Sequence, residues 1–312
     1  MPFPIASGSG QPAYNAFIPE IWSGKLIEKF YDATVLAQIA NTDYEGEIKA
    51  QGDKVIIRQV PTMIIRDYER GMNLQVDRPD APAIELEIDK GKYFNAQCED
   101  VAKVQSDIDL MNTWSTDASE QMKIAIDGSV INAIAPDAVA ANRGTAAGRI
   151  SQNINLGATG DPVLLSSNNV IDWIVDLGQV LDEQNIPETG RWLVLPAWVC
   201  SLIKKSDIRN ASISGGDQSL YRNGRIGEID NFTIYKSNVL TGVVDNTGTA
   251  GGRRCFRPLA GHKNALTFAS QMTKMETLRS ENTFADLMRG LQIYGFKVVD
   301  GTAMASAYVA RA

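Results

Sequence analysis

The segment GDKVIIRQVPTMIIRDYERGMNLQVDRPDAPAIELEIDKGKYF, residues 52–94, is the most informative part of the chain. Residues 55–59 and 84–88 are both typical of strands, and in the second one isoleucine and leucine alternate with acidic residues. The two strands can pair antiparallel. The connection between them is much longer than a common hairpin turn, and connections of this length in compact domains are usually functional or disordered.

This connection is rich in charged and turn-forming residues. Its charged residues include Arg58, Arg66, Asp67, Glu69, Arg70, Asp77 and Arg78. Pro61, Gly71, Pro79 and Pro82 disfavour one continuous sheet and favour a long, bent hairpin. A globular core does not need such a segment, so we expect its binding partner to lie on another molecule.

The residues before the hairpin predict an arm. Residues 1–17 are rich in glycine, serine and proline and are typical of an arm that is either flexible or ordered by a partner. Pro19 then begins an expected amphipathic helix whose apolar face includes Trp22 and Phe30. This helix must dock either on its own core or on a neighbouring subunit, and the sequence leaves both open.

The strongest helix signal lies at residues 107–134. Ser106 or Asp107 can cap its N-terminus, and Pro136 ends it. Such a helix would be about 42 Å long. Small and apolar residues recur along one face at spacings of three and four, which suits a helix lying across a sheet.

The remaining segments predict a second lobe and a return to strands. Residues 166–240 alternate between helices and short strands and end in a hairpin that turns at Asp230 and Asn231, which is typical of an α/β lobe. The C-terminal part is read as strands around a short helical stretch at residues 283–288. These strands are expected to pack on the long helix, so that the second lobe is inserted within the first.

Composition excludes several classes of protein. The 312 residues carry 30 Lys and Arg against 37 Asp and Glu, a net charge of −7, which argues against a dedicated binder of nucleic acid or anionic membranes. No apolar run approaches the ~20 residues of a membrane span, and the N-terminus lacks the pattern of a signal peptide. The three widely spaced cysteines are expected to be free thiols in a reducing compartment, as in a soluble cytosolic protein.

The sequence shows no recognisable catalytic set. Its single histidine, His262, has no second ligand at metal spacing, and the motifs of serine hydrolases, phosphate-binding loops and zinc proteases do not occur. Helix capping and solvated faces account for the carboxylate pairs at residues 107 and 109 and at 182 and 183. We therefore expect no enzyme activity, no cofactor and no metal.

Taken together, six segments resemble the major capsid proteins of tailed bacteriophages, whose fold is shared with herpesvirus capsid floors and encapsulins. They occur in the order that such proteins show and extend over residues 17–299. The matching segments are FIPEIWSGKLIEKF (17–30), NTDYEGEIKAQGDKVII (41–57), EDVAKVQSDIDLM (99–111), GRWLVLPAW (190–198), GRIGEIDNFTIYKSN (224–238) and ALTFASQMTKMETLRSENTFADLMRGLQIYGFKVV (265–299).

The resemblance implies an α+β capsid fold with four parts. These are an N-terminal arm (1–51), an extended β-hairpin loop (52–92), a peripheral domain with a long spine helix (93–165 and 256–312) and an inserted axial domain (166–255). It implies a major capsid protein that assembles with itself, as pentamers and hexamers, into an icosahedral shell in the host bacterial cytoplasm. The shell would enclose double-stranded DNA without binding it specifically, and the expected partners are a scaffolding protein, a portal and a decoration protein.

This resemblance gives the hairpin a role, because it would lie across the neighbouring subunit. Arg58, Arg66 and Arg70 would then pair with acidic groups next door and mainly set the register, while the apolar strand bases and the arm helix would supply most of the burial. Two alternatives stay open at this point. One is an encapsulin-like shell that encloses a protein cargo, and the other is an enzyme of unknown type.

Overall fold

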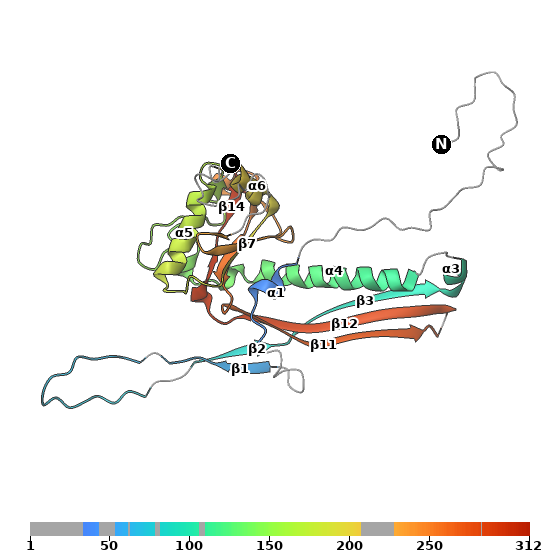
Figure 1. Ribbon diagram of the computed structural model, residues 1–312, viewed down its shortest axis with the longest axis horizontal. Coiled ribbons are helices and arrows are strands. Elements are labelled where there is room, and N and C mark those ends of the chain that lie inside the picture. Colours follow the sequence, from blue (N-terminus) through green and yellow to red (C-terminus); the bar gives the residue numbers. More distant parts are fainter. Residues whose placement is uncertain are drawn as a thin grey trace, which may run out of the picture.

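The computed structural model describes residues 34–43, 54–61, 63–78, 82–105, 110–206, 228–281 and 283–312. It has three parts, which are a globular lobe, a long arm made of a helix on a sheet, and a hairpin that projects away from both (Figure 1). The amphipathic helix predicted for the N-terminal arm, with Trp22 and Phe30, is a different segment and lies outside the described residues.

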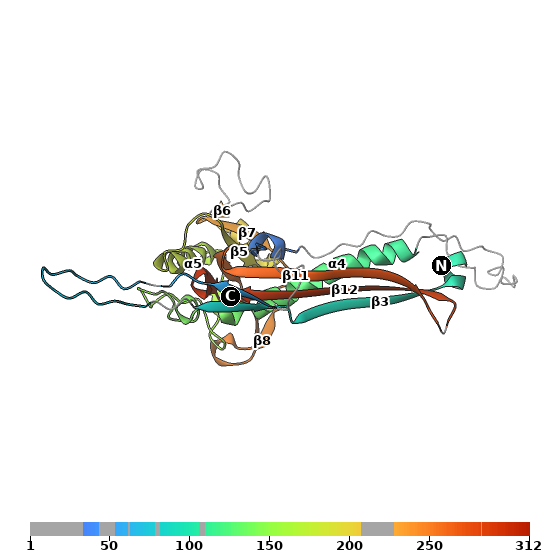
Figure 2. The same cartoon turned by 90° about the horizontal axis from the view of Figure 1, so that it is seen from below.

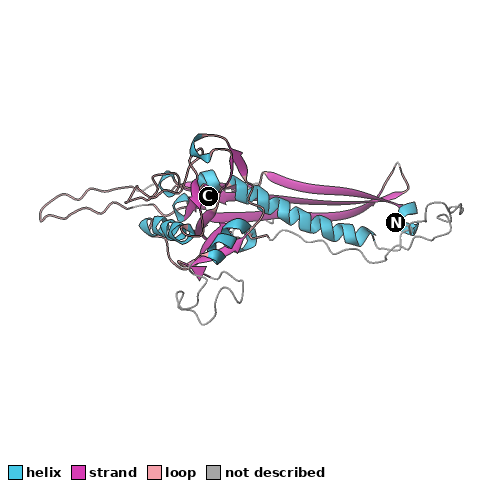
Figure 3. Ribbon diagram, turned by 90° about the horizontal axis from the view of Figure 1, so that it is seen from above, coloured by secondary structure: helices cyan, strands magenta, loops and turns pink. Residues whose placement is uncertain are grey.

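The long arm is built on a three-stranded antiparallel sheet. Its strands are β3 (Lys90–Glu99), β11 (Leu266–Arg279) and β12 (Ala285–Val298), in the order β11-β12-β3. Helix α4 (Leu110–Ala133) runs along the strands on one face of this sheet, and the shorter α3 (Asp100–Gln105) lies near its far end (Figure 3). The predicted helix over residues 107–134 is thus confirmed from residue 110 to residue 133.

The base of α4 is fixed to the sheet by a hydrophobic core. Ile131 and Ile134 are buried there, together with Leu266 and Tyr294 of the strands. A short segment that contains α1 (Leu36–Ile39) packs into the same core. The predicted packing of the C-terminal strands on the long helix is therefore confirmed.

The prediction of a helical stretch at residues 283–288 is wrong. Ala285 begins β12, and residues 285–288 pair with β3 on one side while residues 286–288 pair with β11 on the other. Alanine, leucine and methionine favour helix locally, but pairing on both edges of a central 14-residue strand outweighs that weak preference.

The lobe contains two further sheets. The larger has the order β13-β10-β5-β7-β6, with β5 (Arg191–Leu195), β6 (Glu228–Ile229), β7 (Phe232–Lys236), β10 (Leu259–His262) and β13 (Met304–Ser306). The smaller has the order β4-β14-β9-β8, with β4 (Val163–Leu165), β8 (Val243–Asp245), β9 (Arg253–Phe256) and β14 (Val309–Arg311). Helices α5 (Val170–Glu183) and α6 (Ala197–Lys205) pack on the core around β5.

Local signals in the lobe agree with its structure. The predicted turn between β6 and β7 has positive φ at Asp230 (50°) and Asn231 (61°), as a tight hairpin requires. β5 is buried at every position, as expected for a central strand. However, β10, β13 and β14 come from residues after 255 and lie in the sheets of the lobe, so a boundary at residue 255 does not coincide with a sheet boundary.

Candidate assembly surfaces

The hairpin that projects from the body has an apolar base. Strands β1 (Lys54–Arg58) and β2 (Ala83–Glu87) pair antiparallel over their whole length, from Lys54 opposite Glu87 to Arg58 opposite Ala83. Ile57 and Leu86 are buried against Ala269 of β11. These contacts hold the base of the hairpin on the long sheet, and the predicted pairing of the two strands is confirmed.

The rest of the hairpin has no such support from the described residues of its own chain. Every described residue from 63 to 78 is exposed, and Figure 1 shows this part extending beyond the lobe. Large apolar side chains are among them. Ile65 and Val76 are 90% and 88% exposed, and Val60, just before them, is 92% exposed. Exposed apolar side chains gathered on one segment are a mark of an interaction site.

The predicted charged residues all lie on this hairpin, but two of them bind each other. Arg66 donates to Asp77 through both guanidinium nitrogens, one of them at 3.0 Å from the carboxylate, so the two sides of the hairpin are linked to each other. This hydrogen bonding to Arg66 lowers the pKa of Asp77. The other charged residues are exposed, namely Arg58, Asp67, Glu69, Arg70 and Arg78. Sequence reasoning singled out the charges and missed the exposed apolar residues between them, although Ile64-Ile65 and Val76 stand in the same segment.

A second candidate surface is the face of the long sheet that does not carry α4. Tyr93 is 79% exposed there, and a surface cavity of ≈ 410 Å³ opens beside it. Glu276 lies between Lys274 and Arg289 in this cavity, with the Arg289 guanidinium 2.8 Å away, and both cations lower the pKa of Glu276. One carboxylate thus pairs with two cations, which leaves a net positive charge next to apolar groups such as Leu291.

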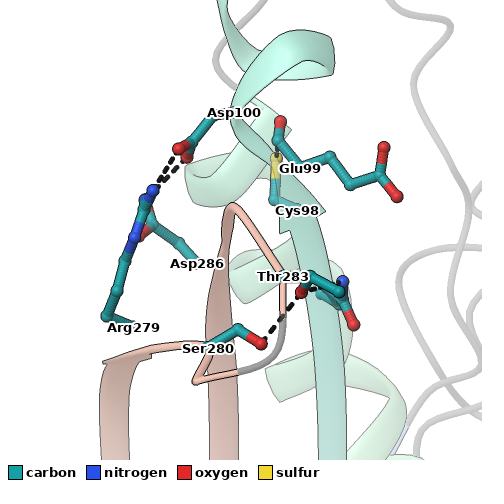
Figure 4. Close-up of polar contacts among 8 residues, drawn as sticks. Cys98, Glu99, Asp100, Arg279, Ser280, Thr283 and Asp286 are labelled. Atoms are coloured by element: carbon teal, nitrogen blue, oxygen red, sulfur yellow. Dashed lines mark hydrogen bonds and ion pairs between the residues drawn. The ribbon is translucent and has the colours of Figure 1, made fainter.

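A third candidate surface is the far end of the long arm (Figure 4). Arg279 bridges Asp100, at the start of α3, and Asp286, near the start of β12, with distances of 2.7 Å and 3.0 Å. Thr283 donates to Ser280 at 2.9 Å within the turn between β11 and β12. Phe284 (83%) and Val104 (84%) are highly exposed close by, so this end combines a fixed polar frame with free apolar side chains.

The described part of the chain shows no site for catalysis by a metal. It contains no group of three or more histidine, cysteine or acidic residues that could hold an ion. His262 is structural, since its Nε2 lies 3.1 Å from the carbonyl oxygen of Thr189 and its Nδ1 accepts the N–H of Asn264. All three cysteines are buried free thiols. Among the described helices, none is long and apolar enough to span a membrane.

Comparisons with known proteins agree on one type of protein. A family described as "Phage capsid protein" matches residues 85–307. Among solved structures, one from Mycobacterium phage Che8 is similar with 26% identity and a TM-score of 0.78, over 94% of this chain and 98% of that one. The capsid of cyanophage P-SCSP1u is similar with 15% identity and a TM-score of 0.73, over 99% and 97% of the two chains. The capsid of a native GTA particle has 14% identity, a TM-score of 0.66 and coverage of 98% and 100%. The curated proteins include no match.

Proposed function

This chain belongs to the phage capsid protein family, and on that basis we propose that it is the major capsid protein of a tailed phage. Copies of it assemble into the icosahedral shell that encloses the double-stranded DNA genome. The observation that supports this function best is the exposed hairpin, since every residue from 63 to 78 is exposed against the described part of its own subunit. The capsid matches make this proposal preferable to an encapsulin-like shell or an enzyme.

The hairpin can stabilise contacts between subunits through its apolar residues. Burial of a valine or isoleucine side chain is worth about 1.5–3 kcal/mol, before the entropy lost on binding is subtracted. Ile64, Ile65, Leu74 and Val76 can all be buried on a neighbour, because each is at least 64% exposed in the subunit. In this proposal the hairpin contributes burial of its own, in addition to that expected from the strand bases and from the helix with Trp22 and Phe30.

The charges of the hairpin have a different role. Exposed ion pairs contribute little free energy, but complementary charges select the partner and its register. Arg66 and Asp77 hold the two sides of the hairpin together. Arg58, Arg70 and Arg78, with Asp67 and Glu69, are then available to set the register on the neighbouring subunit.

The same proposal divides the chain by role. Residues 1–51 form the arm, 52–92 the extended loop, 93–165 and 256–312 the peripheral domain, and 166–255 the axial domain, whose sheets also take in strands from the C-terminal segment. Pentamers and hexamers would form in the host cytoplasm with a scaffolding protein and a portal, and a decoration protein is a further candidate partner. With a net charge of −7 the shell would not hold DNA tightly, which suits a container filled by a motor.

Shortening the hairpin tests the proposal. Residues 63–78 would be replaced by Asn-Gly, which forms a tight turn. We expect a folded, soluble subunit by circular dichroism that forms no closed shells by negative-stain microscopy, whereas the unaltered chain forms them. Closed shells from the shortened chain, or loss of its fold, would contradict the proposed role of the hairpin. Nuclease-protected DNA in particles from infected cells would distinguish a genome from a protein cargo.

A further inference from the structure

Helix α5 presents an acidic stripe in which Asp172 is exposed and Asp176 is half-buried. Asp172, Val175 and Asp176 are spaced by three and four residues and so lie on one face of the helix. Val175 is 47% exposed. Neither carboxylate forms an ion pair within the described residues, and burial together with the nearby Asp172 charge raises the pKa of Asp176. The stripe therefore offers negative charge around an exposed apolar side chain.

The hairpin of β8 and β9 offers the opposite combination. β8 is an edge strand, and its Val243 and Val244 are 61% and 57% exposed. Val244 lies opposite Arg254 in the ladder, and Arg253 is exposed on the same strand, β9. In the described structure the two arginines donate to main-chain carbonyls, such as that of Gly242 at 3.2 Å from Arg254 Nε. We call these four residues the basic hairpin.

The two surfaces lie on different parts of the lobe. In Figure 2 the β8 hairpin projects from one side of the molecule, while α5 lies away from it next to β5. One subunit therefore cannot bring its own basic hairpin onto its own acidic stripe without rearrangement. Two different, complementary surfaces on one chain produce a head-to-tail contact, which closes into a ring when the rotation between copies allows it.

We infer that the basic hairpin of one copy docks on the acidic stripe of the next copy, as a repeated contact within the shell. This inference rests on the proposed function and adds a specific pair of surfaces to it. Val244 and Arg254 lie opposite each other in the ladder and share one face of the hairpin, so Val244 would be buried with Val175 while Arg254 faces Asp172 and Asp176. Arg253, near the tip, adds positive charge beside them. Burial would stabilise the contact, and the charges would select the partner surface and its register.

Charge reversal and charge exchange test the inference. We expect Arg253→Glu with Arg254→Glu, and separately Asp172→Lys with Asp176→Lys, each to lower the yield of sedimenting shells about ten-fold, because every copy in a ring uses both surfaces. The chain with all four substitutions should recover a yield within about three-fold of the unaltered chain, because the pairing is restored with the signs exchanged. Arg149→Glu with Lys263→Glu makes the same change in net charge as the substitution of Arg253 and Arg254, at exposed positions elsewhere, and should leave the yield unchanged.

A second measurement needs no change of charge, in case a reversed variant does not fold. Val175→Cys with Val244→Cys should give covalent multimers longer than dimers on oxidation, whereas either substitution alone should not, since the native cysteines are buried. The inference would be overturned if the unaltered chain formed shells and both charge-reversed variants assembled equally well. It would also be overturned if the cysteine pair gave no covalent multimers. Either result would leave the proposed function intact. An unaltered chain that stays monomeric under all conditions would overturn both.

Discussion

Gly295 of β12 lies directly under the backbone of Glu87, the last residue of β2. A Cβ atom at position 295 would come within 2.1 Å of the Glu87 carbonyl oxygen. The base of the hairpin therefore rests on the long sheet by a close approach of two main chains, which glycine alone permits. The direction in which the hairpin leaves the subunit depends on this contact.

Gly295→Ala should displace the hairpin base without unfolding the lobe. The added methyl group meets main-chain atoms that cannot rotate away, so β2 must shift. We expect a subunit with near-normal circular dichroism but with a clearly lower yield of closed shells. Gly91→Ala, in β3 of the same sheet, is the matched control, because its Cβ would meet nothing closer than 3.8 Å. An equal loss of assembly in both variants would show that the contact with Glu87 is not the cause.

The packing of α4 on the sheet can be tested at one buried hydrogen bond. Ser129 Oγ lies 2.7 Å from the hydroxyl of Tyr294, which is 1% exposed. Tyr294→Phe should lower the free energy of unfolding by about 0.5–1.5 kcal/mol, the usual net value of such a bond. Chemical denaturation would measure it. Ser129→Ala and the double variant complete the cycle, and additive losses would mean that the two groups are not coupled.

Acid should weaken the lobe at Glu183. Its carboxylate accepts the N–H groups of Ile150 (2.7 Å) and Ser151 (3.1 Å), and these bonds lower its pKa to about 2. A carboxylate whose pKa falls on folding stabilises the folded state above its ordinary pKa, 4.5, and that contribution is lost as the pH falls toward 2. Melting temperatures between pH 2.5 and 7 should therefore drop at the acid end. Glu183→Gln should have a lower Tm at pH 7, and its Tm should depend less on pH. If its Tm depended on pH as strongly as that of the unaltered chain, Glu183 would not be the group that makes the lobe sensitive to acid.

Local patterns predicted much of this fold correctly. The alternation in residues 84–88, the stop signal after the long helix and the Asp230-Asn231 turn each predict an element that the structure contains, whereas the predicted N-cap at Ser106 or Asp107 lies outside the described residues. Such signals suffice because each depends on neighbours in sequence. The error at residues 283–288 has the opposite origin, since the strand conformation there comes from pairing with β3, nearly 190 residues earlier in the chain.

The assembly surfaces were only partly predictable for the same reason. The length and charge of the hairpin can be read from the sequence. The hydrogen bond between Arg66 and Asp77, however, depends on how the two sides of the hairpin lie together. The stripe on α5 and the basic hairpin were not predicted. Their residues are ordinary in sequence, and their significance comes from exposure and from their separate places on the lobe.

Proteolysis can report on the hairpin in the free subunit and in the shell. Arg70 and Gly71 form the turn at its tip, and both are exposed. Trypsin cleaves after arginine, but Pro79 blocks the bond after Arg78, and Asp67 and the ion pair with Asp77 disfavour the bond after Arg66. We therefore expect cleavage in the free subunit mainly between Arg70 and Gly71, detected by mass spectrometry as fragments that end at residue 70.

The same bond should resist trypsin once shells have formed, because the hairpin would then lie against a neighbouring subunit. We expect the cleavage rate at Arg70 to fall at least about ten-fold, since the protease needs a locally free and extended segment. Arg70→Gln removes the site and identifies the fragment. Dissociating the shells should restore the original rate, which separates protection by a neighbour from a chemical change in the protein. Equal cleavage of free and assembled chains would mean that the tip stays exposed in the shell, and the apolar residues around it would then need a different partner.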